Sequence, residues 1–321
     1  MRVTFWAGSL LFSAAVGMGC GTTGDGDGTT SSSGGASCDA NASSYAPFSA
    51  ANFTTEQAQV AAYGRISALR KTATFAKSDF TALKTDYDTH FASAVQGLTG
   101  VPSWENANVG TEIHTLINNA INRGLDTNDT TDIAELGQII EKSLIRYLYL
   151  ATYSRVMTTS GDAQANWDKV FGIYGRSEDG ATSAGISGSV KGRDDNYSLT
   201  NNDKVFSALI KGRCAIVDGD NAALTAARTE ITTAMDESMA YSGARYFKKI
   251  SEGGATRVDL AEGGTYWYAV ERRMQAADAA TIRAWVDALM PGGAREDELP
   301  DVDGASTALG LMRSNFSLPA L

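Results

Sequence analysis

From Phe53 onward the sequence repeats apolar residues at spacings of three and four, the period of an α-helix with one buried face. The longest such segment, residues 131–157, has a stripe made of Ile133, Leu136, Ile140, Leu144, Tyr147, Leu148 and Ala151. Apolar and polar residues do not alternate at strand spacing over any sustained stretch, and only five prolines interrupt the chain. The pattern predicts an all-α protein, an up-and-down bundle of about eight to ten helices.

The individual helices are expected at residues 54–74, 79–98, 111–125, 131–157, 165–174, 203–217, 222–250, 260–276, 281–290 and 305–314. Residues 175–200 are rich in glycine and polar side chains, and we expect a long loop there between two helical halves. Because no convincing repeat relates the halves, the sequence favours one helical domain, residues 49–321. A content of 43% hydrophobic residues suffices for a sizeable core.

The first nineteen residues have the layout of a cleaved secretory signal peptide. Arg2 supplies a positive charge, residues 3–16 are mostly apolar and small, and Gly17-Met18-Gly19 precedes Cys20. The apolar stretch is too short for an ordinary transmembrane helix. Residues 1–19 are therefore expected to be removed during export.

Cys20 resembles the lipid-modified cysteine of bacterial lipoproteins, although Gly17 stands where their motif usually has leucine. Residues 21–37 contain no large apolar side chain and are typical of a flexible linker, so we assign residues 20–48 to a lipidated cysteine and its tether. This predicts a palmitate-type anchor in a bacterial membrane, at the periplasm or cell surface. The outer membrane is favoured because no aspartate follows Cys20. The alternative is a plain signal peptide in which Cys20 has no role.

The other two cysteines, Cys38 and Cys214, can form a disulfide in an exported protein or remain as two unrelated thiols. Their spacing does not decide between these alternatives. The sequence has no CxxC pair or Cys/His cluster, which disfavours a structural zinc site. The net charge is −10 and no basic run interleaves with aromatic residues, so no nucleic-acid partner is expected.

Two glutamates lie in unusually aromatic segments. Glu141 begins the run 141–149, and Glu262 lies within the run 259–271. On a continuous helix, Asp259, Glu262 and Tyr266 would share one side, and Glu271 would lie on another. The glycine pair at 263–264 costs about 1 kcal/mol per residue relative to alanine inside a helix, so a closely packed helix or ligand should offset it.

Two simpler interpretations apply to Glu262. In one, the helix breaks at Gly263-Gly264 and leaves Glu262 as a solvated end residue. In the other, Glu262 forms a structural ion pair with a basic residue such as Lys142 or Arg146.

Three segments, residues 139–149, 166–172 and 260–268, resemble the iron-assimilation family, which includes low-iron-inducible periplasmic proteins and related bacterial lipoproteins. Such proteins are broadly similar to imelysin-type helical lipoproteins. The resemblance covers most of residues 53–291. It departs from the family where a histidine is expected before the Glu-Gly element, because Val258-Asp259 stands there.

The resemblance implies an exported lipoprotein that binds iron or an iron-bearing ligand, with a possible iron-uptake partner. The expected ligands are oxygen donors, which suit a hard cation; they are Glu262, Glu141 and Asp259, with Tyr266 and Glu271 in support. No catalytic residue is assigned, since the HExxH and GxSxG motifs are missing. The alternatives are an imelysin-like hydrolase with Glu262 as general base, and a structural or adhesion lipoprotein in which these carboxylates form salt bridges.

Overall fold

The computed structural model describes residues 38–99, 105–254, 256–319 and 321. Their regular structure is helical, and the only β-feature in these ranges is an isolated bridge between Arg176 and Ser183. The all-α prediction is therefore confirmed, with twelve α-helices in the described ranges. They are α1 (Thr54–Arg70), α2 (Phe80–His90), α3 (Ala92–Gln96), α4 (Val109–Leu125), α5 (Ile133–Met157), α6 (Ala163–Tyr174), α7 (Gly185–Tyr197), α8 (Asn201–Asp218), α9 (Asn221–Ser251), α10 (Arg257–Val270), α11 (Ala276–Leu289) and α12 (Val302–Phe316). Short 3₁₀ turns occur at Ala50–Phe53, Lys77–Asp79 and Glu271–Arg273.

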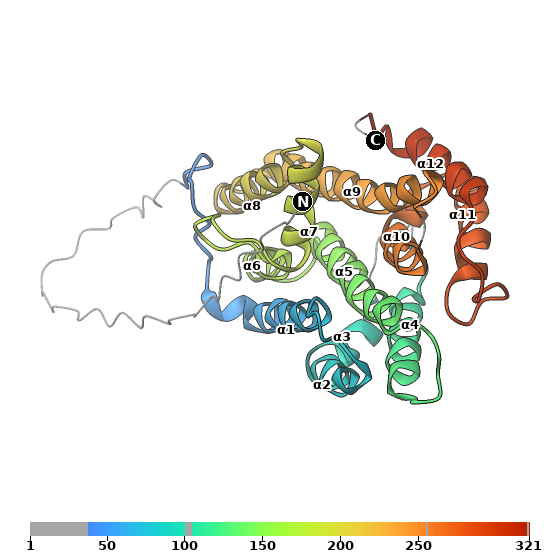
Figure 1. Cartoon of the computed structure of the whole chain (residues 1–321). Coiled ribbons are helices and arrows are strands. Elements are labelled where there is room, and N and C mark those ends of the chain that lie inside the picture. Colours follow the sequence, from blue (N-terminus) through green and yellow to red (C-terminus); the bar gives the residue numbers. More distant parts are fainter. Residues whose placement is uncertain (1–37, 100–104, 255, 320) are drawn as a thin grey trace, which may run out of the picture. The chain divides into compact units, whose positions relative to one another are not determined.

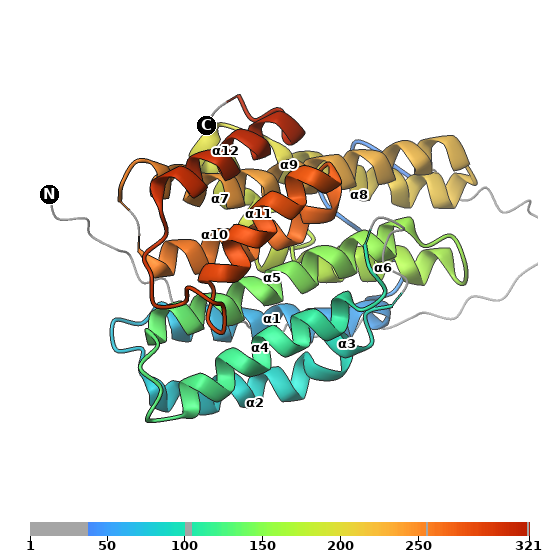
Figure 2. The same cartoon turned by 90° about the vertical axis from the view of Figure 1, so that its right-hand side faces the viewer.

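Helix α5 is the centre of the bundle. It runs between α8 and α9 on one side and α1 to α4 on the other (Figures 1 and 2). Every residue from 135 to 153 is buried, although the sequence predicted only a single buried stripe. These residues include Glu135, Glu141, Lys142 and Arg146, and a charge that is buried must find a partner inside the protein. The position of α5 therefore forces an internal network of polar contacts.

The predicted long loop at residues 175–200 is wrong, because residues 185–197 form α7. Ile186 and Val190, one helical turn apart, are completely buried in the main core. Two apolar residues among glycines and polar side chains give a weak periodic signal. The helix forms because packing against its neighbours stabilises a segment of low intrinsic propensity. The predicted helix 79–98 also differs, since it divides into α2 and α3 at the buried Phe91.

Helix α10 continues through Gly263 and Gly264, so the predicted alternative of a break at this pair is wrong. A Cβ atom on Gly263 would lie 2.6 Å from Cβ of Tyr246 in α9. A Cβ atom on Gly264 would lie 2.8 Å from Cγ1 of Val286 in α11. The pair thus permits the close approach of neighbouring helices that the sequence led us to expect.

The segment that precedes α1 is fastened to the helical domain. Cys38 forms a disulfide with Cys214 of α8, which settles the choice that the sequence left open. The Tyr45 ring is buried and stacks on Phe171 of α6, with ring centroids 4.0 Å apart. Residues 38–48, which the sequence assigned to the tether, therefore pack against the domain expected from residue 49.

Asp168 of α6 holds this segment through four hydrogen bonds. Its carboxylate accepts from the Tyr45 hydroxyl at 2.9 Å and from the Asn52 amide at 2.8 Å. It also accepts from the backbone N–H groups of Phe48 at 3.1 Å and Ser49 at 2.9 Å. Asp168 lies in the segment 166–172 on which the family resemblance partly rests, so the structure gives that segment a role in the fold.

The predicted signal peptide and the predicted lipid site Cys20 lie outside the described residues. Among the residues that are described, no helix combines the length and apolar character needed to cross a membrane.

Candidate functional site

Three of the five predicted ligand residues meet around a buried lysine. Lys142 of α5 places its Nζ 3.2 Å from Oε2 of Glu141 and 3.2 Å from Oε1 of Glu262. The same Nζ lies 5.4 Å from the centre of the Tyr266 ring. We call Glu141, Lys142, Glu262 and Tyr266 the Lys142 cluster. It forms where α5 packs against α10, which brings together residues about 120 positions apart in the chain.

Helix α1 supplies the other partners of Glu141. The hydroxyls of Tyr63 and Ser67 donate to Oε1 at 3.2 and 2.7 Å, and the Arg70 guanidinium donates to Oε2. The Nζ of the exposed Lys71 lies 4.0 Å from Oε1. Positions 63, 67 and 70 recur at helical spacing, so one face of α1 points these donors at a single carboxylate.

These contacts fix the charge state of both buried groups. Burial raises the pKa of Glu141, but Lys142, Arg70 and the Ser67 hydroxyl outweigh it and lower the pKa to about 2. Burial lowers the pKa of Lys142, but the Tyr266 phenol and the two glutamates outweigh it and raise the pKa above its ordinary range. Glu141 is therefore a carboxylate and Lys142 an ammonium at neutral pH.

Glu262 lies on the solvent side of the cluster, with 15% of its side chain exposed. Burial, together with the nearby Glu262 carboxylate, raises the pKa of the Tyr246 phenol of α9. The rings of Tyr246 and Tyr266 are nearly parallel, with centroids 6.5 Å apart. Phenol groups from two helices thus border the carboxylates.

The other two predicted ligands make their contacts elsewhere. Asp259 caps the start of α10 through Thr256, and its Oδ1 accepts a hydrogen bond from Lys249 at 2.6 Å. Glu271 forms a two-pronged ion pair with Arg283 of α11. Both carboxylates therefore already have structural partners.

The ion pair between Glu262 and Lys142 is the one that the sequence offered as a structural alternative. Arg146, the other basic residue considered, instead lies 3.5 Å from Glu112 and over the ring of Tyr268. Throughout the described part of the chain, no group of three or more His, Cys, Asp or Glu side chains is arranged to hold a metal ion. With Lys142 in place, the cluster is an internal ion-pair network.

Sequence reasoning missed the contributions of α1 and α9. Tyr63 and Ser67 are buried beside the apolar residues of α1, and Tyr246 approaches from α9. A regular recurrence of hydroxyl and basic residues in α1 was the only signal, and it does not say which helix the residues face.

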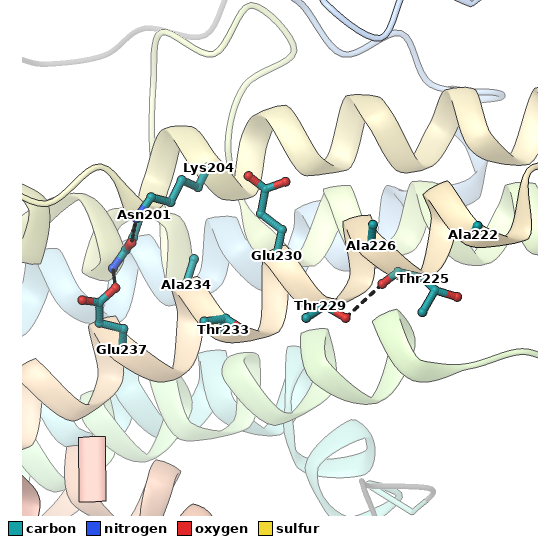
Figure 3. A pocket seen from close by; sticks show the side chains of 10 residues that line it. All are labelled: Asn201, Lys204, Ala222, Thr225, Ala226, Thr229, Glu230, Thr233, Ala234 and Glu237. Carbon is teal, nitrogen blue, oxygen red and sulfur yellow. Dashed lines mark hydrogen bonds between the residues drawn. The ribbon is translucent and has the colours of Figure 1, made fainter. Parts of the chain in front are cut away.

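A separate groove of about 580 Å³ runs along α8 and α9 (Figure 3). Alanine and threonine side chains of α9 form most of its lining, with Lys204 of α8 at one edge. Within it, Asn201 donates to Oε2 of Glu237 at 3.0 Å. No residue of the Lys142 cluster lines the groove, and none of the predicted ligands does.

Comparison of the chain with protein-family models, with curated proteins and with solved structures finds no match.

Proposed function

We propose that this chain is an exported lipoprotein of the iron-assimilation type, which binds iron or an iron-bearing ligand at the Lys142 cluster. The observation that carries the proposal is the convergence of Glu141, Glu262 and Tyr266 at one place. Carboxylate and phenol oxygens are ligands suited to a hard cation such as ferric iron. Iron is the cargo in this proposal, and no step of turnover is needed.

The neighbouring helices support such a role by positioning the donors. Glu141 is held by Tyr63, Ser67 and Arg70 from α1, so its carboxylate is oriented before any ligand arrives. Glu262 is paired with Lys142 and remains partly exposed, which gives the cluster a side facing solvent. A prearranged donor set reduces the ordering cost of binding.

The proposal places the protein outside the cytoplasm, anchored through Cys20 to a bacterial membrane, with the outer membrane favoured. The layout of residues 1–20 supports export. The Cys38–Cys214 disulfide is a second supporting observation, because such bonds persist mainly in oxidising compartments. An iron-uptake partner would then receive or deliver the ion.

A second candidate is a structural or adhesion lipoprotein in which the carboxylates only stabilise the bundle. It is favoured by the pairing of every predicted carboxylate ligand with a basic residue. The pairs are Glu141 and Glu262 with Lys142, Asp259 with Lys249, and Glu271 with Arg283.

Iron retention distinguishes the two. The chain is incubated with ferrous or ferric iron, desalted, and analysed for iron per chain by plasma mass spectrometry. We expect near-stoichiometric iron in the wild type and its loss in Glu262→Gln and Glu141→Ala. The exposed Glu252 provides a matched control, and Glu252→Ala should retain iron. Circular dichroism establishes that each variant is folded.

A folded wild-type chain that retains no iron would contradict direct binding of the ion and favour the structural role. Equal retention by wild type and both cluster variants would move the binding site elsewhere.

A further inference from the structure

The ammonium of Lys142 occupies the space between two carboxylates. It lies 3.2 Å from one oxygen of Glu141 and 3.2 Å from one oxygen of Glu262, and its side chain is only 6% exposed. The face of the Tyr266 ring lies on a further side of the ammonium, at 5.4 Å from its centre. Lys142 is thus a compact internal cation in a setting of negative charge and aromatic surface.

Glu141 has contacts that do not involve Lys142. Glu141 is held by the hydroxyls of Tyr63 and Ser67 and by Arg70. Glu262 lies on α10, where the nearby Tyr266 ring is nearly parallel to the Tyr246 ring of α9. Glu141 can therefore keep its position on α5 when the ammonium leaves, and Glu262 remains beside it because α10 packs directly against α5.

We propose that Lys142 is the gate of the site, because its ammonium fills the position that a bound metal cation would take between Glu141 and Glu262. The ammonium and the ion are then mutually exclusive, and binding requires the Lys142 side chain to move away. This inference rests on the proposed function for the location of the site. It does not require that iron displaces the Lys142 ammonium in the wild-type protein.

The charge of Lys142, rather than its bulk, is what closes the site. Lys142→Met keeps a long unbranched side chain and removes the charge, which leaves two carboxylates facing each other. Lys142→Gln is also neutral, and its amide can still donate a hydrogen bond to one carboxylate. Lys142→Arg keeps the positive charge and serves as the matched control.

The test measures binding of iron supplied as ferric nitrilotriacetate to the full exported chain, by competition and by iron content after desalting. We expect Lys142→Met and Lys142→Gln to bind at least about tenfold more tightly than the wild type, because a like charge has been removed from the binding position. Lys142→Arg should bind no more tightly than the wild type. Adding Glu262→Gln to Lys142→Met should abolish the gain, since one of the two carboxylates is then neutral.

A folded neutral variant that binds iron no more tightly than the wild type overturns the gate, even if the wild type binds iron. In that case the proposed function stands and only the role of Lys142 fails. The opposite conclusion follows if the neutral variants bind iron tightly and the wild type binds none. That result supports the gate and contradicts iron binding by the native chain. Tighter binding by Lys142→Arg as well would overturn the proposal, because the charge would then not matter.

Discussion

Asp168 illustrates how one buried carboxylate can organise a segment that has little regular structure. It is fully buried and accepts hydrogen bonds from two side chains and two backbone N–H groups of residues 45–52. Removing the carboxylate would leave the buried Tyr45 hydroxyl without this partner, whereas the other three donors are only partly buried. An unsatisfied buried donor costs about 1 to 3 kcal/mol.

We therefore expect Asp168→Ala to lower the free energy of unfolding by about 3 kcal/mol, a value typical of a broken buried polar network. Urea denaturation followed by circular dichroism measures the change. Asp195 forms an exposed i,i+4 pair with Lys191, so Asp195→Ala should change stability by less than about 0.5 kcal/mol. Equal stability of the Asp168 and Asp195 variants would show that the four hydrogen bonds contribute little.

At this scale the sequence identified Glu141, Glu262 and Tyr266 as unusual but could not identify their partners. Glu141 is 71 residues away from Arg70, with which it pairs, and 121 residues separate it from Glu262. Helical periodicity says which side of a helix is buried, but not which helix will cover it. Asp259 and Glu271 looked like equally suitable ligands in the sequence. In the structure, Asp259 caps the start of α10 and Glu271 forms an ion pair with Arg283.

At the scale of helices, α10 depends on residues without side chains. Gly263 and Gly264 face α9 and α11 respectively, and each would bring a Cβ atom closer to its neighbour than side chains normally pack. Replacing such a glycine gains helix propensity but loses more through overlap with the neighbouring helix.

Gly263→Ala should destabilise the protein by about 1 to 3 kcal/mol, since its Cβ would meet Cβ of Tyr246, an atom close to the backbone of α9. Gly64 of α1 is a suitable comparison because nothing lies within 4 Å of a Cβ atom there. Gly64→Ala should stabilise by up to about 1 kcal/mol. Thermal unfolding of both variants gives the signs, and stabilisation by Gly263→Ala would contradict the close packing of α9 and α10.

Most helices were predictable because their apolar stripes match the core that they face. The sequence located α1, α4, α5, α8 and α9 to within a few residues of their observed bounds. Helix α7 was not predicted because Ile186 and Val190 are its main buried apolar residues, and its other residues are equally common in loops. Its stability comes from neighbouring helices, which local sequence does not reveal.

For the molecule as a whole, the disulfide joins residues separated by 176 positions. Closing so long a loop restricts the unfolded chain, and the chain-entropy account assigns about 5 kcal/mol to a loop of this length, with measured values typically 2 to 4 kcal/mol. Reduction should therefore weaken the domain without altering its helical content under native conditions.

We expect a reducing agent to lower the free energy of unfolding of the wild type by about 2 to 4 kcal/mol. A Cys38→Ser/Cys214→Ala variant should have that lower stability with or without the reducing agent. Urea denaturation in both conditions measures the two quantities. Insensitivity of the wild type to reduction would mean that noncovalent contacts, including the hydrogen bonds to Asp168 and the stacking of Tyr45 on Phe171, hold the N-terminal segment without the disulfide.

The Cys38–Cys214 bond also determines how the domain bears load. Tension applied to the chain ahead of residue 38 passes through this covalent link directly into α8. Helices α1 to α7 lie within the loop that the disulfide closes, so the covalent path from residue 38 to α8 bypasses them. Tension applied ahead of residue 38 is therefore not transmitted along the backbone of α1 and α5, the helices that supply Glu141 and its hydrogen-bond donors.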